Sequence, residues 1–280
     1  MSITIGGKIP QSISIGGKAV ASLSINGEVV WPDTPSGPDY LYIENTYVGQ
    51  NTIIVHAYSA AGTTDAQYSK DGTNWTNMVF DSFPKNINIT LNQGEKVYFR
   101  SSTGWSGDGN GIRIQPQQSA IAGGDLRTII DYTNVNSITS IGQHDINCLF
   151  KAGWSAIRPV SGLTDISAVK LNTITSTTST DAFADFCWKC PNLVKGIDLS
   201  PITSIYDSPS FDPDGTFQNM YLDCHQLNEA WAPNIQTWDD DQFYHWLENV
   251  SASGTLHAPT GITIPTGVYG IPNGWSRIDY

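Results

Sequence analysis

A repeat in the last third of the chain sets the strictest limit on the fold. Four segments begin with an apolar residue and carry further apolar residues three and four positions later. They start at Ile146, Phe183, Phe217 and Phe243, which lie 37, 34 and 26 residues apart. Apolar residues at i, i+3, i+4 and i+7 predict one face of a helix. Because one unit cannot bury that face alone, units that recur in this way are expected to stack.

Two further signals recur in these units. A short β-type phrase comes first: "ITSI" at 138–141 and 202–205, "ITST" at 174–177 and "IQTW" at 235–238. Aspartates lie close before the apolar segments, namely Asp145, Asp181, Asp214 and the run 239–241. Carboxylates at such positions accept hydrogen bonds from the first helical N–H groups and favour the helix dipole. Each unit is therefore predicted to be a strand followed by a helix.

The wording of the central units resembles a known repeat family. "FADFCWKCPNLVKGIDLSPITSI" (183–205) and "FQNMYLDCHQLNEAWAPNI" (217–235) are similar to irregular BspA-like leucine-rich repeats. The ending "GTLHAPTGITIPTGVYGIPNGWSRIDY" resembles the closing segment of that family. The resemblance implies a leucine-rich-repeat solenoid over 119–280 with a C-terminal cap, and it implies adhesion or protein–protein contact. The first unit departs from the pattern, with Gly153 where the family has a cysteine.

The middle of the chain has a different pattern. The proline-rich stretch "PDTPSGPD" at 32–39 indicates a linker. Residues 40–118 then hold six or seven short alternating segments and a hairpin with Asp71-Gly72 at its turn, which together predict a β-sandwich. The expected fold class is therefore mostly β with some α, and it joins a β-repeat segment, a β-sandwich and a solenoid.

The first 31 residues repeat one ten-residue phrase three times. Two-residue hairpin turns are predicted at Gly6-Gly7, Gly16-Gly17 and Asn26-Gly27. Between the last two turns, Val20 and Leu23 are three residues apart and so point to opposite faces. A bent chain would turn both clusters to one axis, so residues 1–31 are expected to be completed by other subunits, as in a homotrimer. The alternative is a small meander packed on the next domain. The phrase resembles the openings of tail and fibre proteins from phages of gut Bacteroidetes, and this resemblance implies that residues 1–31 bind other virion proteins.

Composition and charge limit the classes of partner that the protein is expected to have. Charged residues make up 14% of the chain, below the roughly 25% of an average soluble protein, while Trp and Tyr number nine and twelve. A net charge of −12 argues against a nucleic-acid partner. No apolar run approaches the roughly 18 residues of a membrane span, so membrane insertion is not expected.

The start of the chain adds an expectation about localisation. "MSITIGGKIPQSISIGG" lacks a basic region followed by an apolar one, so export by a secretory signal is not expected. A surface-type composition without an export signal is typical of phage proteins, which fold in the host cytoplasm and leave by lysis. The expected localisation is therefore the virion, with the four cysteines kept as thiols.

Aromatic residues are the candidate binding residues. Trp75 and Trp105 in the predicted sandwich, and Trp231 and Trp238 in the predicted solenoid, are expected to stack on sugars of a host surface. The alternative is structural: Trp75 anchors a hairpin, Trp105 plugs the sandwich end, and the last two cap the core. Two idiosyncratic insertions, 161–172 and 206–215, are predicted to be exposed loops that take part in binding together with Trp231 and Trp238, and the alternative is that they are idle loops. Trp238→Ala is expected to weaken binding with little change in melting temperature.

Signals for chemistry are weak. Cys187-x-x-Cys190 has no second pair at the spacing that a zinc site needs. Cys190 and Cys224 hold equivalent repeat positions and are predicted to be small apolar core residues. No nucleophile, phosphate-binding or metalloprotease motif occurs, and the aspartate pairs lie in turn-like "DPDG". No catalytic residue, metal or cofactor is therefore predicted, and the protein is not expected to be an enzyme.

The expected function is that of a structural phage virion protein, namely a tail fibre or a receptor-binding component that contacts a host glycan or protein. Two alternatives remain open. One is a bacterial surface adhesin or carbohydrate-binding protein with the same repeats. The other is a polysaccharide depolymerase, although such enzymes usually carry a long β-helix and a carboxylate cluster.

Overall fold

The computed structural model describes residues 39–57, 65–80, 85–102, 112–142, 146, 148–152, 161–206 and 215–280, together with the backbone of four short strands nearer the N-terminus. The chain divides into two compact units, Met1–Asp39 and Tyr40–Tyr280. Strands predominate in the described residues and helices are few and short, so the protein is mostly β.

The first unit contains two antiparallel strand pairs. β1 (Ser14–Ile15) pairs with β2 (Lys18–Ala19), and β3 (Leu23–Ile25) pairs with β4 (Glu28–Trp31). Ile15 lies opposite Lys18 and Ile25 opposite Glu28, as the second and third predicted hairpins require. The first predicted hairpin and the glycines of all three turns lie outside the described residues.

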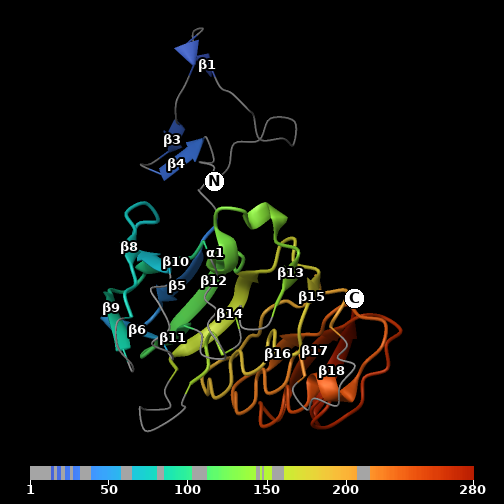
Figure 1. The fold of residues 1–280 in the computed structure, drawn as a ribbon. Helices are drawn as coiled ribbons and strands as arrows, with labels where there is room; N and C mark the ends of the chain where they lie inside the picture. Colours follow the sequence, from blue (N-terminus) through green and yellow to red (C-terminus); the bar gives the residue numbers. More distant parts are fainter. Residues whose placement is uncertain are drawn as a thin grey trace. The chain divides into compact units, whose positions relative to one another are not determined.

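Two sheets form the first part of the second unit (Figure 1). The larger sheet has the order β14-β12-β5-β10-β7-β8 and the smaller one β11-β6-β9. The strands of the larger sheet are β5 (Leu41–Asn45), β7 (Gln67–Ser69), β8 (Thr76–Asn77), β10 (Lys96–Arg100), β12 (Ala120–Asp125) and β14 (Leu163–Lys170). Those of the smaller sheet are β6 (Asn51–Ala57), β9 (Lys85–Leu91) and β11 (Ile112–Pro116). Alternating residues such as Leu41, Ile53 and Val97 are fully buried, because one face of each sheet covers the core.

Strand β12 joins these sheets to the repeats. It pairs antiparallel with β5 on one side and parallel with β14 on the other. A Cβ at Gly123 would lie 2.5 Å from the Tyr42 hydroxyl and 3.0 Å from the Ala168 Cβ, so this close crossing requires glycine. The prediction that 161–172 forms an exposed loop is wrong, since β14 takes up eight of those residues. Its Leu163, Ile166 and Val169 are buried, and this burial holds the strand in the sheet.

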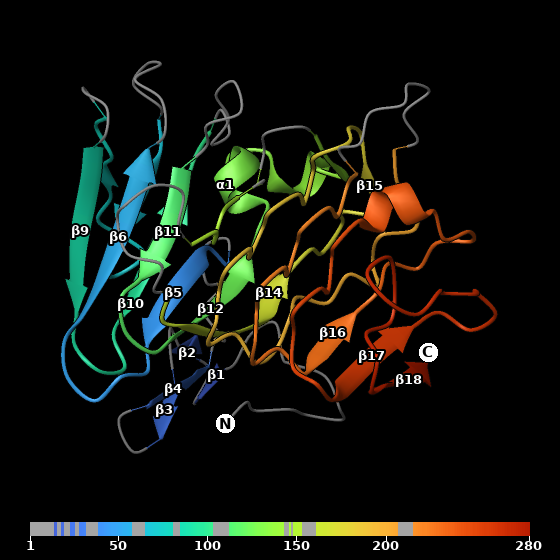
Figure 2. The same ribbon diagram turned by 90° about the horizontal axis from the view of Figure 1, so that it is seen from below.

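Beyond β14 the chain winds in successive coils, one for each repeat of the sequence, and their short strands pair in parallel (Figure 2). One ladder passes from Asp165 of β14 through Lys195 to Glu229. It continues through β16 (Glu229–Trp231), β17 (Gly254–Ala258) and β18 (Trp275–Asp279), which pair in parallel. A second ladder joins β13 (Ser140–Ile141), β15 (Ser176–Thr177) and then Ser204. Parallel pairing between successive units is possible because each coil returns the chain to the same edge.

The predicted helices at the four apolar segments are wrong. The described residues there form consecutive turns, and only Phe243 belongs to a helix, the short 3-10 helix η2 (Asp240–Phe243). Alternate N–H groups donate to the next coil, as from Asp185 to the Gln218 carbonyl at 2.9 Å and from Cys187 to the Met220 carbonyl at 2.8 Å. The residues between them donate back three positions, which closes a turn.

Positive φ angles explain why these turns replace a helix. Outward residues of the turns adopt left-handed conformations: Cys148, Asp185, Lys189, Asn219, Asp223, His245 and Asn249. Turns of four residues place inward side chains at positions 0, 3, 4 and 7, the same positions that an amphipathic helix uses. The apolar pattern therefore fits both structures, and the hydrogen bonds to the neighbouring coil decide between them.

The core of the coils is a stack of equivalent side chains. The Phe183 and Phe217 rings lie 5.4 Å apart and nearly parallel, and the Phe217 and Phe243 rings lie 5.0 Å apart. Two further short helices, α1 (Thr128–Asp131) and η1 (Val135–Ser137), precede the coils. The expected helix start at 239–241 is confirmed for η2, whose N-cap Asp239 accepts a hydrogen bond from the Asp241 N–H. Asp181 precedes a turn, and Asp145 and Asp214 lie outside the described residues.

Candidate ligand-binding site

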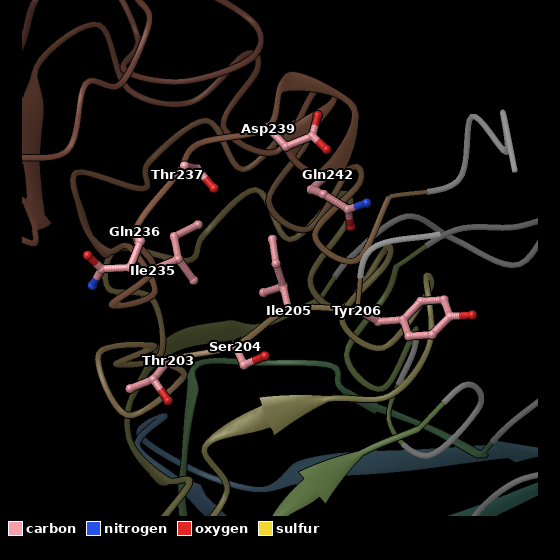
Figure 3. Close-up of a pocket in the computed structure, with 9 residues that line it drawn as sticks. All are labelled: Thr203, Ser204, Ile205, Tyr206, Ile235, Gln236, Thr237, Asp239 and Gln242. Carbon is pink, nitrogen blue, oxygen red and sulfur yellow. The ribbon is translucent and has the colours of Figure 1, made fainter. Parts of the chain in front are cut away.

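A pocket of about 260 Å³ opens between the last two coils (Figure 3). One wall is the run from Thr203 to Tyr206, and the other comes from the run 235–239 and from Gln242. Among the described residues, the ladder through Ser140 and Ser176 ends at Ser204, where the Asn234 N–H of the next coil donates to the Ile202 carbonyl at 2.7 Å. The two coils are joined again where the Phe217 N–H donates to the Gln242 carbonyl at 2.9 Å, and the pocket lies between these two bonds.

The pocket has an apolar base and a polar rim. Ile205 and Ile235 pack against the core, and their side chains approach one another from the two walls (Figure 3). The rim carries hydroxyl, amide and carboxylate groups from Thr203, Ser204, Gln236, Thr237 and Asp239. Small-molecule sites commonly combine an apolar surface with a few fixed polar groups that orient the ligand.

Gln242 is the most firmly held polar group of the pocket. The residue is only 6% exposed, and its Oε1 accepts a hydrogen bond from the buried Thr216 N–H at 3.0 Å. Its Nε2 group makes no hydrogen bond to any residue that the structure describes. A Cβ at the neighbouring Gly215 would lie 2.1 Å from the Asp241 carbonyl oxygen, so glycine lets the two coils approach here. The bond to Thr216 therefore holds the Gln242 side-chain amide in place at the edge of the pocket.

Tyr206 and Asp239 complete the rim. Tyr206 is 40% exposed, and its N–H donates to the Thr177 hydroxyl at 3.0 Å, which holds the backbone beneath the ring. Asp239 is exposed and caps η2 through Oδ1. The predicted binding segment 206–215 thus contributes Tyr206 to the pocket, while residues 207–214 lie outside the described part of the chain.

Trp238 lies next to this pocket but does not line it. Its ring packs on Phe243 with centroids 3.6 Å apart, and it contacts Trp246 edge-on at 5.4 Å. Its Nε1–H donates to the Tyr269 carbonyl at 2.7 Å. These contacts use the indole within the protein, as the structural alternative for this residue expects.

Trp231 belongs to a separate surface on the outer face of β16 and β17. Its ring stacks on the imidazole of His257 with centroids 4.6 Å apart and an interplanar angle of 7°. His257 Nε2 lies 3.2 Å from Glu229, whose other oxygen pairs with Lys195 at 3.0 Å. One face of the Trp231 ring is covered by His257, so a stacked sugar would have to use the other face.

Trp75 and Trp105, the two candidate binding residues of the two-sheet region, have different outcomes. Trp75 contacts Tyr40 edge-on at 4.6 Å, and the Arg100 guanidinium lies 4.0 Å above its ring. Arg100 also lies 4.3 Å from the Tyr132 ring centroid, so the cation is held between two aromatic rings. Trp105 lies outside the described residues.

The cysteines are embedded in the core of the coils. Cys187, Cys190 and Cys224 are fully buried, and all four cysteines are free thiols. Cys190 Sγ donates to the Phe150 carbonyl and Cys224 Sγ to the Cys187 carbonyl, each at 3.0 Å. Burial raises the pKa of the Cys187 and Cys224 thiols well above the usual value. Among the described residues, no group of three or more His, Cys, Asp or Glu side chains is placed to hold a metal.

A buried ion pair was not foreseen from the sequence. Lys151 is fully buried, and its Nζ pairs with the Asp185 carboxylate and lies 4.0 Å above the Trp188 ring. Burial lowers the pKa of the Lys151 ammonium, because the charged form is poorly solvated there. The pair joins two adjacent coils, since Lys151 and Asp185 lie in successive repeat segments.

Comparisons with protein-family models, with curated proteins and with solved structures find no match. Among the described residues, no helix is long and apolar enough to cross a membrane. The residues that sequence reasoning missed are Gln242 and the wall from Thr203 to Ile205. Their polar side chains resemble those of any surface, and only the separation of two coils brings them together around one space.

Proposed function

We propose that this protein is a structural component of a phage virion, a tail fibre or receptor-binding protein that recognises a bacterial surface glycan. In this proposal the two packed sheets act as a β-sandwich spacer. The parallel coils act as a leucine-rich-repeat solenoid closed by the segment after β17. The first 31 residues attach the chain to other virion proteins and form a trimer.

The observation that carries the proposal is the pocket between Tyr206 and Gln242. Stacked coils hold their inward side chains by packing, so the outward groups of one gap can be kept rigid at small entropic cost on binding. The lining combines an anchored amide, hydroxyl groups, one carboxylate and an exposed tyrosine. Saccharides present hydroxyl groups around an apolar ring face, which such a lining complements.

Binding to bacterial cells tests this assignment. We expect the purified full chain, labelled with a fluorophore, to bind cells of gut Bacteroidetes strains in flow cytometry. Tyr206→Ala should reduce binding, whereas Tyr47→Ala, which removes an equally exposed tyrosine from the two-sheet region, should not. Equal loss in both variants, or no binding to any strain that hosts such phages, would contradict the proposal.

Assembly and location are tested separately. Light scattering of the full chain should give three times the chain mass of 30.5 kDa. Antibody to the chain should label one structure of purified virions in electron micrographs. A monomer at micromolar concentration would contradict the proposed trimer. Virions that the antibody does not label would contradict the proposed role in the virion.

A further inference from the structure

The charge around the pocket limits which ligands it can take. Between Lys195 and Arg277 the sequence holds ten Asp and Glu residues and no Lys or Arg. All the described residues that line the pocket belong to this stretch. Asp239 lines it, and Asp240 and Asp241 follow in η2 as exposed residues.

The cations that border this stretch are engaged elsewhere. Lys195 Nζ pairs with Glu229 at 3.0 Å. Arg277 pairs with Asp279 at 2.5 Å and donates to the carbonyls of Ile262 and Pro259. Among the lining residues that the structure describes, the pocket therefore has one carboxylate, that of Asp239, and no cationic side chain.

The histidines of the stretch do not change this balance. His245 contacts Glu248, His257 contacts Glu229, and His225 Nδ1 lies 2.8 Å from the Asn249 carbonyl oxygen. None of the three lines the pocket. An anionic ligand would therefore meet the Asp239 carboxylate with no counter-charge among the described lining residues, and the two negative charges would repel.

We infer that the pocket binds a single saccharide unit that carries no negative charge, and that it prefers a unit with a free amino group. This inference rests on the proposed glycan recognition and adds the charge class of the ligand. The volume of about 260 Å³ lies just below the roughly 300–1,000 Å³ of pockets for drug-sized ligands, so it suits one sugar unit.

Each part of the ligand has a partner in the pocket. The Gln242 Nε2 group donates to a ring hydroxyl or acetamide oxygen. The Asp239 carboxylate accepts from an ammonium or hydroxyl group, in a charge-assisted bond when the donor is an ammonium. Ile205 and Ile235 cover the apolar face of the ring, and Tyr206 at the rim attracts a nearby cation.

Calorimetric titration of the full chain with matched trisaccharides tests the charge class. The probes are tri-glucosamine, tri-N-acetylglucosamine and tri-galacturonate, with tri-lysine as a peptide amine. We expect tri-glucosamine to bind at least tenfold more tightly than tri-galacturonate, with tri-N-acetylglucosamine between them. The difference should narrow in 0.5 M NaCl, because salt screens exposed charges.

Two variants assign the effect to the pocket. Asp239→Asn keeps a side-chain oxygen that can cap η2, since Asn and Asp are comparable N-caps. It should remove most of the preference for tri-glucosamine. Gln242→Glu keeps an oxygen for the Thr216 N–H but loses both donors, so it should weaken tri-N-acetylglucosamine about tenfold and spare tri-glucosamine. Glu44→Gln in the larger sheet is the charge-matched control, and unfolding curves check that every variant folds.

The outcomes separate this inference from the proposed function. Equal or tighter binding of tri-galacturonate would overturn the charge class and leave glycan recognition standing. Binding of tri-lysine without any sugar would assign the pocket to a peptide amine and overturn the inference. Binding to cells without binding any of the four probes would overturn the inference alone. Failure to bind cells and probes alike would overturn both.

Discussion

The indole of Trp238 stacks on the ring of Phe243, with centroids 3.6 Å apart and an interplanar angle of 16°. The same indole donates to the Tyr269 carbonyl at 2.7 Å, so it joins the last coil to the segment between β17 and β18. The expectation that Trp238→Ala would leave the melting temperature nearly unchanged no longer holds, because the ring contributes to packing.

We expect Trp238→Ala to lower the free energy of unfolding by roughly 2–3 kcal/mol, from lost packing and one lost hydrogen bond. Urea unfolding followed by fluorescence measures this change. Trp231→Ala is the matched control, since that ring lies on the outer face and stacks on His257. It should lower stability by less than about 1 kcal/mol. Similar losses in the two variants would contradict the role given to Trp238.

The consecutive turns of the repeat segments should tolerate β-branched residues poorly at positions with a positive φ. Asn219 has φ of 52°, a conformation that asparagine tolerates and β-branched residues avoid. Asn219→Val should therefore lower the free energy of unfolding by about 1–2 kcal/mol. Gln226→Val, at an exposed position of the same coil without a positive φ, should have a small effect.

The turns of the repeat segments also affect the circular dichroism spectrum of the protein. Because the repeat segments are turns and not helices, the far-ultraviolet spectrum should lack a strong helical minimum at about 222 nm. A spectrum that requires four helices of two turns each would contradict the assignment of these segments as turns.

The thiols are expected to differ in accessibility. Cys187, Cys190 and Cys224 are fully buried, whereas Cys148 is partly exposed. Burial also raises the pKa of Cys187 and Cys224, and the thiolate is the reactive form. Iodoacetamide at pH 8 should leave these three residues unmodified in the native protein, as read by peptide mass spectrometry. All four should react in guanidinium chloride. Rapid native labelling of Cys190 or Cys224 would contradict their place in the core.

Acidification should weaken the fold through His56. Burial lowers the pKa of this imidazole, whose Nδ1 lies 2.6 Å from Asn86 Oδ1 and whose Nε2 lies 3.0 Å from Gln115 Oε1. The folded-state pKa is below the unfolded value of about 6.5, so the unfolded chain binds more protons as pH falls. The contribution of His56 to the free energy of unfolding is therefore complete above the unfolded pKa, and it is lost as pH falls from there through the folded pKa.

We therefore expect the free energy of unfolding to decrease between pH 7.5 and 5, and His56→Gln to reduce that decrease. Urea unfolding at several pH values measures both. His225→Gln is the control, because His225 is exposed. An unchanged pH dependence in His56→Gln would show that other groups cause it.

Several features of the fold follow from local sequence alone. The pairing of Ile15 with Lys18 and of Ile25 with Glu28 agrees with two-residue turns, which depend on neighbouring residues only. The burial of Phe183, Phe217, Cys190 and Cys224 follows from their equivalent places in a repeat, because equivalent positions of stacked units face the same core. The start of η2 after Asp239 likewise follows from capping by a local side chain.

The spacing of the apolar residues is enough to identify the inward side chains and the period of the repeat, because burial of apolar side chains depends on that spacing. The hydrogen bonds between coils are needed to show that the repeat segments are turns, since a helix and a run of four-residue turns share the same apolar spacing. Their difference lies in bonds such as Cys187 N–H to the Met220 carbonyl, 33 residues away. The pocket likewise depends on contacts between coils. Its walls come from two coils that are joined by the bond between Asn234 and Ile202 and again by the bond between Phe217 and Gln242, and no local sequence pattern indicates the space between these bonds.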